Sequence, residues 1–387
     1  MKQVISTEAK PIKLWLNDLD DKALEQAKNL ANLPFTFKHI ALMPDAHLGY
    51  GMPIGSILAT KSVVVPNAVG VDIGCGMCAV RTSLDKIEKS DLKRILQQIR
   101  ELIPLGFDCH EEAQDENLMP KGYEDLKVVS KQYNKAIKQL GTLGGGNHFI
   151  EIQKGSDGYI WVMIHSGSRN LGYKVANHYN KIAERLNALF HSQVTKKMEL
   201  AFLPIQSIEA KDYIDEMKYC VEFALANRKL MINRVLEAIK HVMGDFENGD
   251  IINESHNFAA WEHHFGSDVL VHRKGATRAY LGELGMIPGS QGTKSYIVKG
   301  LANEDSFKSC SHGAGRQLGR KQAQRELNLE HEIAMLDKQN IVHTIRCKND
   351  LDEAPSAYKD INTVMENQKD LVDIIVELSP LAVVKGN

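Results

Sequence analysis

The sequence predicts a mixed α/β (α+β) fold in which strands carry the functional site and helices cover them. Two observations predict this fold class. Glycines and histidines are concentrated in short blocks that lie beside apolar, strand-like runs. The middle of the chain instead has the apolar periodicity of amphipathic helices. No repeat, low-complexity tract or Pro-rich linker divides the sequence, so we expect a single interleaved catalytic domain over residues 1–387.

The strand-like runs lead into the Gly-rich blocks. The runs are residues 62–66, 159–164 and 269–272. Glycine is common where the backbone approaches a ligand closely or takes a positive φ. We therefore expect ligands to bind at the ends of strands. The blocks are residues 43–55, 69–78, 141–151, 164–172, 256–272 and 287–316.

The helical part is a predicted excursion over residues 174–243. Residues 174–190 read as helix, and within residues 213–242 apolar side chains recur at alternating steps of three and four, which is typical of an amphipathic helix. The apolar stripe needs a partner face, so a packed helical hairpin is favoured over a separate functional module. The stripe is Ile214, Met217, Val221, Ala224, Met231, Val235, Ala238 and Val242.

Composition excludes several classes of protein. Charged residues make up 25% and hydrophobic residues 43%, as in ordinary soluble globular proteins. The 47 basic and 49 acidic residues almost balance, so any contact with a nucleic acid must be a local patch. We find no signal peptide and no apolar stretch of about 18 residues, the length that crosses a membrane. Six cysteines are too few for a disulfide scaffold, which indicates a cytoplasmic protein with free thiols.

The segment VGVDIGCGM offers a carboxylate and a thiolate to the same small volume. Asp72 and Cys75 are three residues apart among glycines. This pairing of a hard and a soft ligand suits a borderline divalent metal. The alternative is a redox motif formed by Cys75 and Cys78. It is less favoured, because glycines surround the pair and no helical pattern follows at once.

Four histidines supply further candidate ligands. His148, His165, His256 and His312 lie in separate Gly-rich or polar turns. A lone histidine is more often a hydrogen-bonded polar or core residue than a ligand. Four of them together with an aspartate and a cysteine favour ligation, and six donors are enough for two metals with room left for a substrate.

Three loops and one strand end have the composition of phosphate-binding sites. The loops are HSGSRNLG, PGSQGTKS and HGAGR, which combine backbone amides, hydroxyls and an arginine. Each loop alone is weak evidence, since Gly-Ser turns are common. The segment HRKGATR, residues 272–278, follows a predicted strand and suggests a phosphate or RNA-backbone clamp, with a solvated strand end as the alternative.

Together these blocks resemble the RtcB-type RNA ligase family, which joins RNA ends with GTP and manganese. The matching segments run in order from Met43 to Gly386, which makes coincidence implausible. The resemblance implies an RtcB-like single domain with central sheets. The segments are MPDAHLGYGMPIG, VGVDIGCGM, GTLGGGNHFIE, HSGSR, SHNF, HRKGATR, IPGSQGTKSY, SCSHGAGR, AYKDI and VVKG.

The resemblance also implies roles for particular residues. His312 takes the place of the covalent guanylate acceptor, and Arg316 would face the phosphates. Cys75 would bridge two Mn²⁺ ions. The implied ligands of these ions are Asp72, Cys75, His148, His165 and His256. The implied contacts of the guanine nucleotide are Asn147, Phe149, Glu151, Ser290, Ser295, Ala314, Tyr358 and Lys385.

The implied substrates are GTP and RNA with a 2′,3′-cyclic phosphate or 3′-phosphate end and a 5′-hydroxyl end. The implied intermediates are His312-GMP and an RNA 3′-diphosphate-guanosine. The sequence leaves open the physiological RNA, the oligomeric state and the need for a protein activator. Residues 109–121 lie between the matching segments and look specific to this chain, so its substrate preference is expected to differ from that of other family members. Two other functions stay open: a dinuclear metallohydrolase or cyclic phosphodiesterase, and a non-catalytic RNA-end-binding accessory protein.

Overall fold

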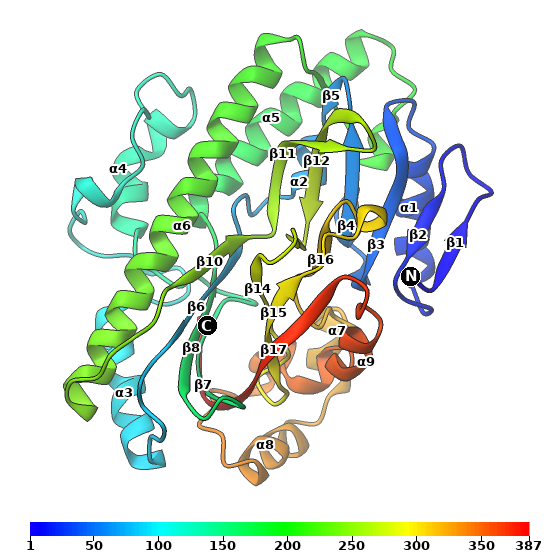
Figure 1. Ribbon diagram of the computed structural model, residues 1–387. Coiled ribbons are helices and arrows are strands. Elements are labelled where there is room, and N and C mark those ends of the chain that lie inside the picture. Colours follow the sequence, from blue (N-terminus) through cyan, green and yellow to red (C-terminus); the bar gives the residue numbers. More distant parts are fainter. Residues whose placement is uncertain (387) are drawn as a thin grey trace.

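Two large β-sheets form the centre of the molecule, and most helices lie around them (Figure 1). This computed structural model describes residues 1–386. Strands and helices alternate irregularly along the chain, which confirms the predicted mixed α/β fold. None of the helices in residues 1–386 is both long enough and apolar enough to span a bilayer.

The first sheet combines the N-terminal part of the chain with a hairpin from much later in the sequence. Its neighbouring strands are antiparallel except β2 and β3, which are parallel. The pairing of β4 with β12 brings residues 56–60 beside residues 270–274. In spatial order the strands are β1 (Gln3–Ile5), β2 (Ile12–Leu14), β3 (Thr36–His47), β4 (Ile54–Thr60), β12 (Ser267–Lys274) and β11 (Asn257–His264).

The second sheet is antiparallel throughout and gathers strands from residues 76 to 385. In spatial order they are β10 (Ile252–Ser255), β6 (Gly76–Arg81), β8 (Ile160–Ser166), β7 (Phe149–Gly155), β17 (Val372–Lys385), β15 (Ser295–Gly300) and β14 (Leu284–Ile287). Two short ribbons accompany the sheets: β13 (Ala276–Arg278) with β16 (Ser309–Ser311), and β5 (Val63–Val64) with β9 (Leu203–Pro204).

The helices differ greatly in length. The α-helices are α1 (Asp21–Ala31), α2 (Pro66–Val69), α3 (Lys89–Leu102), α4 (Val129–Gln139), α5 (Arg169–Leu189), α6 (Ile208–Met243), α7 (Arg320–Glu326), α8 (Leu329–Lys338) and α9 (Ile361–Glu366). The 3₁₀ helices are η1 (Glu116–Leu118), η2 (Lys196–Met198), η3 (Glu304–Ser306), η4 (Lys348–Glu353) and η5 (Pro355–Ala357).

Helix α6 is longer than the apolar pattern predicts and packs on more than one partner. The Ser207 hydroxyl accepts a hydrogen bond from the Ala210 N–H and caps its first turn, and Gly244 ends it with a φ of 85°. Besides α5, the helix contacts α3 and strands β6, β8 and β10. The cluster of apolar residues between α3, α6 and the second sheet includes Ile99, Val162 and Ile232. Helix α6 therefore covers one face of that sheet (Figure 1).

The predicted strand over residues 62–66 is mostly wrong. Only Val63–Val64 form a strand, because Pro66 begins α2. Proline has no backbone N–H to donate to a sheet, and its fixed φ suits the first turn of a helix. The other two predicted runs are strands in the structure, β8 and β12, and both extend two residues beyond the predicted ends.

Candidate metal centre and adjoining cavity

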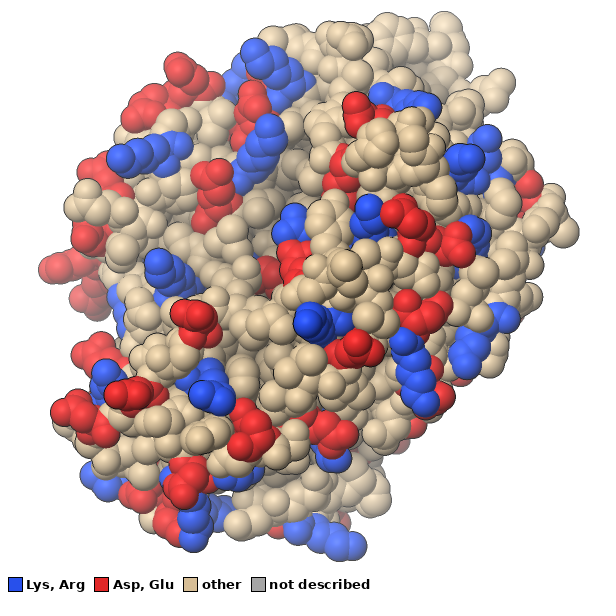
Figure 2. All heavy atoms as spheres, viewed as in Figure 1, with Lys and Arg blue, Asp and Glu red and all other residues tan. Residues whose placement is uncertain are grey.

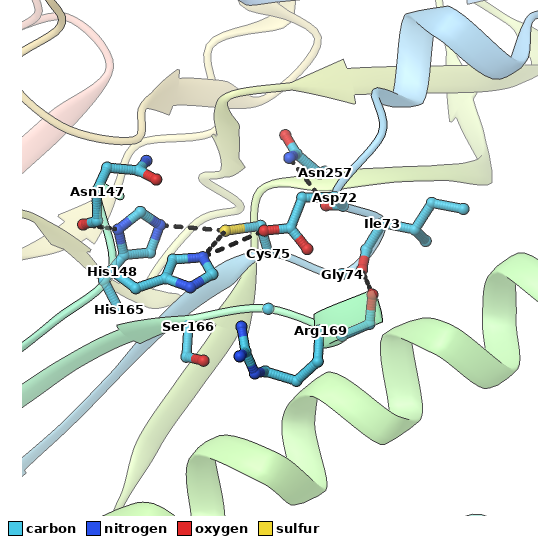
Figure 3. Close-up of polar contacts among 12 residues, drawn as sticks. Asp72, Ile73, Gly74, Cys75, Asn147, His148, His165, Ser166, Arg169 and Asn257 are labelled. Atoms are coloured by element: carbon cyan, nitrogen blue, oxygen red, sulfur yellow. Dashed lines mark hydrogen bonds and ion pairs between the residues drawn. The ribbon is translucent and has the colours of Figure 1, made fainter. Parts of the chain in front are cut away.

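Neighbouring strands bring together donors that are far apart in the sequence (Figure 3). Asp72 and Cys75 lie in the loop before β6, His148 directly precedes β7, and His165 lies in β8. His256 lies between β10 and β11, where its backbone N–H donates to the carbonyl of Cys75 over 2.8 Å. The pairing of β6 with both β8 and β10 places these segments side by side.

The donor atoms of these five residues form one chain of short contacts. The Sγ of Cys75 lies 3.2 Å from the Nε2 of His165 and 3.5 Å from the Nε2 of His148. The Nε2 of His148 lies 3.2 Å from the Oδ2 of Asp72. The Nε2 of His165 lies 3.3 Å from the Nε2 of His256. The structure thus brings all five predicted ligands together.

Backbone carbonyls set the orientation of two of the imidazoles. The Nδ1 of His148 donates to the carbonyl of Leu143 over 3.0 Å, and the Nδ1 of His165 donates to that of Asn147 over 3.1 Å. A carbonyl oxygen only accepts hydrogen bonds, so the Nδ1 atom of each ring carries a proton. The lone pair of each Nε2 then faces the cluster, as metal-binding histidines require.

The electrostatics of the cluster also fit a divalent cation. Burial lowers the pKa of His165 and of His256 well below the usual range, so both rings are neutral near pH 7. Burial and the charge of Asp72 raise the pKa of the Cys75 thiol. Burial opposes the ionisation of Asp72, but the combined effect of its contacts with His148 and Cys75 and of the nearby Arg169 charge lowers its pKa. Several lone pairs and a carboxylate therefore converge where a cation would stabilise them.

His312 lies beside this cluster and is held by one aspartate. The centroid of its ring is 4.7 Å from that of His256. Its Nδ1 donates to the Oδ2 of Asp45 over 2.6 Å, and its backbone N–H donates to the same oxygen over 3.1 Å. Asp45 lies in β3 and is fully buried. Because the carboxylate only accepts, it fixes the Nδ1 proton and leaves Nε2 available.

A cavity of about 670 Å³ joins His312 to the donor cluster. Four of the five predicted metal ligands line it, whereas His148 lies behind Cys75 and does not. Of the nine predicted nucleotide contacts only Ser295 does not line it, since its hydroxyl is buried against Gln153 and the backbone of Gly289. The nucleotide contacts that line the cavity are Asn147, Phe149, Glu151, Ser290, Ala314, Arg316, Tyr358 and Lys385.

Glu353, which no sequence motif indicated, holds three of the residues that line one end of this cavity. Its carboxylate accepts hydrogen bonds from Arg316 and Lys385, each over 2.9 Å, and from the hydroxyl of Tyr358. Burial opposes ionisation of Glu353, but the charges of Lys385 and Arg316 outweigh it and lower its pKa to about 2. Burial raises the pKa of Glu151 to about 8, against the opposing charge of Lys385. Glu151, which lines the cavity, is therefore mostly protonated near pH 7, whereas Glu353, which contacts the lining residues Arg316, Tyr358 and Lys385 from outside the lining, is charged.

Sequence reasoning missed Asp45 and Asn257, and Arg169 makes contacts other than the phosphate binding expected of the loop HSGSRNLG. The side-chain amide of Asn257 donates to the carbonyl of Asp72 over 3.0 Å and holds the ligand loop. The guanidinium of Arg169 donates to the carbonyl of Gly106 and the hydroxyl of Thr142. The motif MPDAHLGYGMPIG contains Asp45, and the motif SHNF contains Asn257. These motifs are the sequence signal that could have indicated the two residues.

The structure argues against the redox alternative for Cys75 and Cys78, which the sequence already disfavours, and against one residue of the suggested RNA clamp. Cys78 packs in the apolar cluster beneath α3 and α6, and burial raises its pKa to about 12, so it is not a redox thiol. Within HRKGATR, Arg273 is fully buried and pairs with Glu262, so it does not clamp RNA. Lys274, the next residue, lines the cavity.

The family model and the relatives that match this chain all carry the same family name. The family model described as tRNA-splicing ligase RtcB matches residues 26–121 and 109–386. The chain is 37% identical to RNA-splicing ligase RtcB1 of Escherichia coli (strain ATCC 25922) and 36% identical to RNA-splicing ligase RtcB of Escherichia coli (strain K12), over 99% of each chain. It is 32% identical to the tRNA-splicing ligase RtcB of Thermococcus kodakarensis, over 95% of this chain and 91% of the relative. The chain therefore belongs to the tRNA-splicing ligase RtcB family.

Proposed function

We propose that this chain is an RNA ligase that uses GTP and two Mn²⁺ ions to join RNA ends. Its substrates are a 2′,3′-cyclic phosphate or 3′-phosphate end and a 5′-hydroxyl end. The observation that carries the proposal is the arrangement around His312, whose Nε2 is free while Asp45 holds its Nδ1, beside a metal-binding cluster in one cavity. The names of the relatives, RNA-splicing and tRNA-splicing ligases, support the same function.

The first step uses His312 as the nucleophile. Its Nε2 attacks the α-phosphorus of GTP, so that an N–P bond forms while the bond to pyrophosphate breaks. The Nδ1 proton stays on the ring, where Asp45 accepts its hydrogen bond at 2.6 Å. The positive charge that develops on the imidazole is therefore offset by the carboxylate of Asp45.

The ions would be held by Asp72, Cys75, His148, His165 and His256, with Cys75 as the bridge. Its sulfur lies between the two imidazoles of His148 and His165, which supports that role. Bound divalent cations supply charge that offsets the crowded negative oxygens of the phosphates.

The guanine nucleotide would occupy the part of the cavity near Glu151 and Lys385. The mostly protonated carboxyl of Glu151 and the aromatic ring of Phe149 lie on this side, and Lys385 is 5.8 Å from the Phe149 ring. The guanidinium of Arg316 would bind the phosphates of the nucleotide. Ser295 is buried off the cavity, so we propose that it supports the backbone of Gly289 in the nucleotide loop. The remaining contacts would come from Asn147, Ser290, Ala314 and Tyr358.

The later steps follow from leaving-group chemistry. A cyclic end is first opened by water to a 3′-phosphate. An oxygen of this phosphate attacks the phosphorus of His312-GMP, and the N–P bond breaks, which gives an RNA 3′-diphosphate-guanosine. The 5′-hydroxyl oxygen then attacks the RNA phosphorus, GMP leaves and the hydroxyl proton passes to solvent. Activation is needed because a phosphate monoester is otherwise a poor electrophile for an alcohol.

A joining assay tests the proposal against its two alternatives. The protein is incubated with Mn²⁺, GTP, a 2′,3′-cyclic-phosphate RNA and a 5′-hydroxyl RNA, and the products are separated by length. A joined RNA that requires GTP is the expected result. Opening of the cyclic phosphate without joining would instead identify a hydrolase, and binding without any reaction would identify an accessory protein.

A further inference from the structure

Helix α6 places a fully buried arginine directly behind the metal-binding cluster. Arg228 makes four hydrogen bonds through its guanidinium. Its Nη1 donates to the carbonyls of Gly74 and Ser166, each over 2.9 Å. Its Nη2 donates to the hydroxyl of Ser255 over 3.2 Å, and its Nε donates to the Oδ1 of Asn253 over 2.8 Å.

Three of these four partners are sequence neighbours of candidate metal ligands. Gly74 directly precedes Cys75, Ser166 directly follows His165, and Ser255 directly precedes His256. A single planar group therefore ties together three segments that are separated by as many as 181 positions. The spacing of the three ligands depends on how these segments are held, because their side chains start from this backbone.

Asn227, the preceding residue of α6, makes the corresponding contacts to the segment of His148. Its side-chain carbonyl accepts hydrogen bonds from the N–H groups of Gly141 and Thr142, over 2.7 and 3.1 Å. Its amide donates to the hydroxyl of Ser166 over 3.2 Å. That hydroxyl donates over 2.8 Å to the carbonyl of Leu143, which is also the acceptor for the Nδ1 of His148.

The loop that carries Asp72 and Cys75 also lies directly against the backbone of α6. Gly74 has a φ of 76°, and a Cβ placed on it would lie 2.9 Å from the Cα of Val221 in the helix. Only glycine allows so close an approach at this backbone conformation. Helix α6 is thus in contact with the ligand loop through both its backbone and its polar side chains.

We infer that Arg228, supported by Asn227, is a positioning residue that sets the geometry of the metal centre before metal binds. This inference rests on the metal centre in the proposed function. The planar fork of arginine can donate in several fixed directions at once, whereas the ammonium of lysine cannot reproduce that pattern. Groups that orient metal ligands typically change metal affinity 10–100-fold when they are lost. The helical segment therefore contributes to the chemistry of the site and not only to packing.

The experiment compares two equally buried arginines. Arg228→Lys keeps the charge but removes the fork. Arg273→Lys is the matched control, because Arg273 is also fully buried and makes four hydrogen bonds, to Glu262, Ser309 and Phe307, none of which is next to a candidate ligand. Mn²⁺ alone is titrated calorimetrically into metal-free full-length protein. Co²⁺ alone is titrated in parallel, and the thiolate-to-cobalt absorption band is recorded.

Arg228→Lys is expected to weaken Mn²⁺ binding by about 10-fold or more and to reduce or shift the thiolate-to-cobalt band. Arg273→Lys is expected to lower thermal stability but to bind both ions as the wild type does. Unchanged Mn²⁺ affinity in a folded Arg228→Lys protein overturns the inference and leaves the proposed function intact. Wild-type protein that binds no Mn²⁺ overturns both.

A milder variant covers the case in which Arg228→Lys does not fold. Ser255→Ala removes only the hydroxyl that accepts from Arg228 and donates to the Gly74 carbonyl. Loss of this hydroxyl and its hydrogen bonds is expected to weaken Mn²⁺ binding roughly 5-fold. Wild-type affinity in Ser255→Ala would then contradict the positioning role.

Discussion

His312 and Asp45 show how much a single residue depends on a distant part of the chain. The two residues are separated by 267 positions, yet Asp45 accepts hydrogen bonds from both the ring and the backbone of His312. The motif SCSHGAGR was enough to single out His312. Asp45 could not be predicted in the same way. Its position within a long Gly-rich motif does not indicate that its partner is a histidine 267 positions away.

Glu353 was missed for a similar reason, and its role can be tested through stability and pH. Glu353→Gln leaves Arg316 and Lys385 without their shared counter-charge, so we expect a loss of about 3 kcal/mol in the free energy of unfolding near pH 7. The folded pKa of about 2 lies below the ordinary value of 4.5. The stabilisation is therefore fully present above about pH 4.5 and is lost as the pH falls towards 2.

Denaturant unfolding of wild type and Glu353→Gln between pH 2 and 7 checks this prediction. The stability difference should shrink steadily on acidification. Glu262→Gln is the control, because Glu262 also has a pKa lowered to about 2 and pairs with a buried arginine, but its partners Arg273 and His264 do not line the cavity, whereas Arg316 and Lys385 do. Only the Glu353 variant should also need more GTP for half-maximal guanylylation. A pH-independent difference for Glu353→Gln would rule out the assigned ion pairs.

At the scale of elements, the amphipathic pattern predicted α6 but not what its buried polar residues do. An arginine or asparagine within a helical pattern looks the same in sequence whether it faces water or the interior. Burial of Arg228 and Asn227 became visible only when the partner segments were in place. The sequence pattern favours a packed helical hairpin, whereas the helix in the structure also contacts the sheet that carries the ligands.

Strand β17 brings Lys385 into the cavity and provides a test at this scale. Lys385 pairs in register with Phe149 and contacts Glu353. Removal of residues 385–387 should raise the GTP concentration for half-maximal guanylylation about 10-fold, the equivalent of about 1.4 kcal/mol. Mn²⁺ content should not change, since Lys385 contacts none of the candidate ligands. The full-length variant Lys385→Met removes the charge but keeps the length of the strand. Wild-type GTP dependence in both the truncated protein and Lys385→Met would exclude a role of Lys385 in nucleotide binding.

For the whole molecule, the set of donors was predictable from the sequence but their distances were not. The ligands span residues 72 to 256, and their donor atoms come into contact only because β6 pairs with β8 and β10 and because β7 pairs with β8. Positive and negative side chains are interspersed over the face in Figure 2. This agrees with the near-balance of charge in the sequence and directs attention to the cavity for substrate binding.

Convergence of distant segments predicts that metal stabilises the entire fold. Mn²⁺ at about 100 times its dissociation constant should add about 2.7 kcal/mol, which corresponds to a rise in Tm of roughly 3 °C for a chain of this size. Cys75→Ala should abolish this rise, the bound manganese and guanylylation together, because the bridging thiolate is lost. Calorimetric Tm and elemental analysis measure both properties. Normal manganese content in Cys75→Ala would contradict the bridge.

The most direct test of the central claim is to locate the guanylate. The protein is incubated with Mn²⁺ and α-labelled GTP, and the labelled peptide is identified by mass spectrometry. Acid-labile, alkali-stable GMP on His312, absent from His312→Ala, is the predicted result. Equal labelling of wild type and His312→Ala, or no labelling of the wild type, would contradict it.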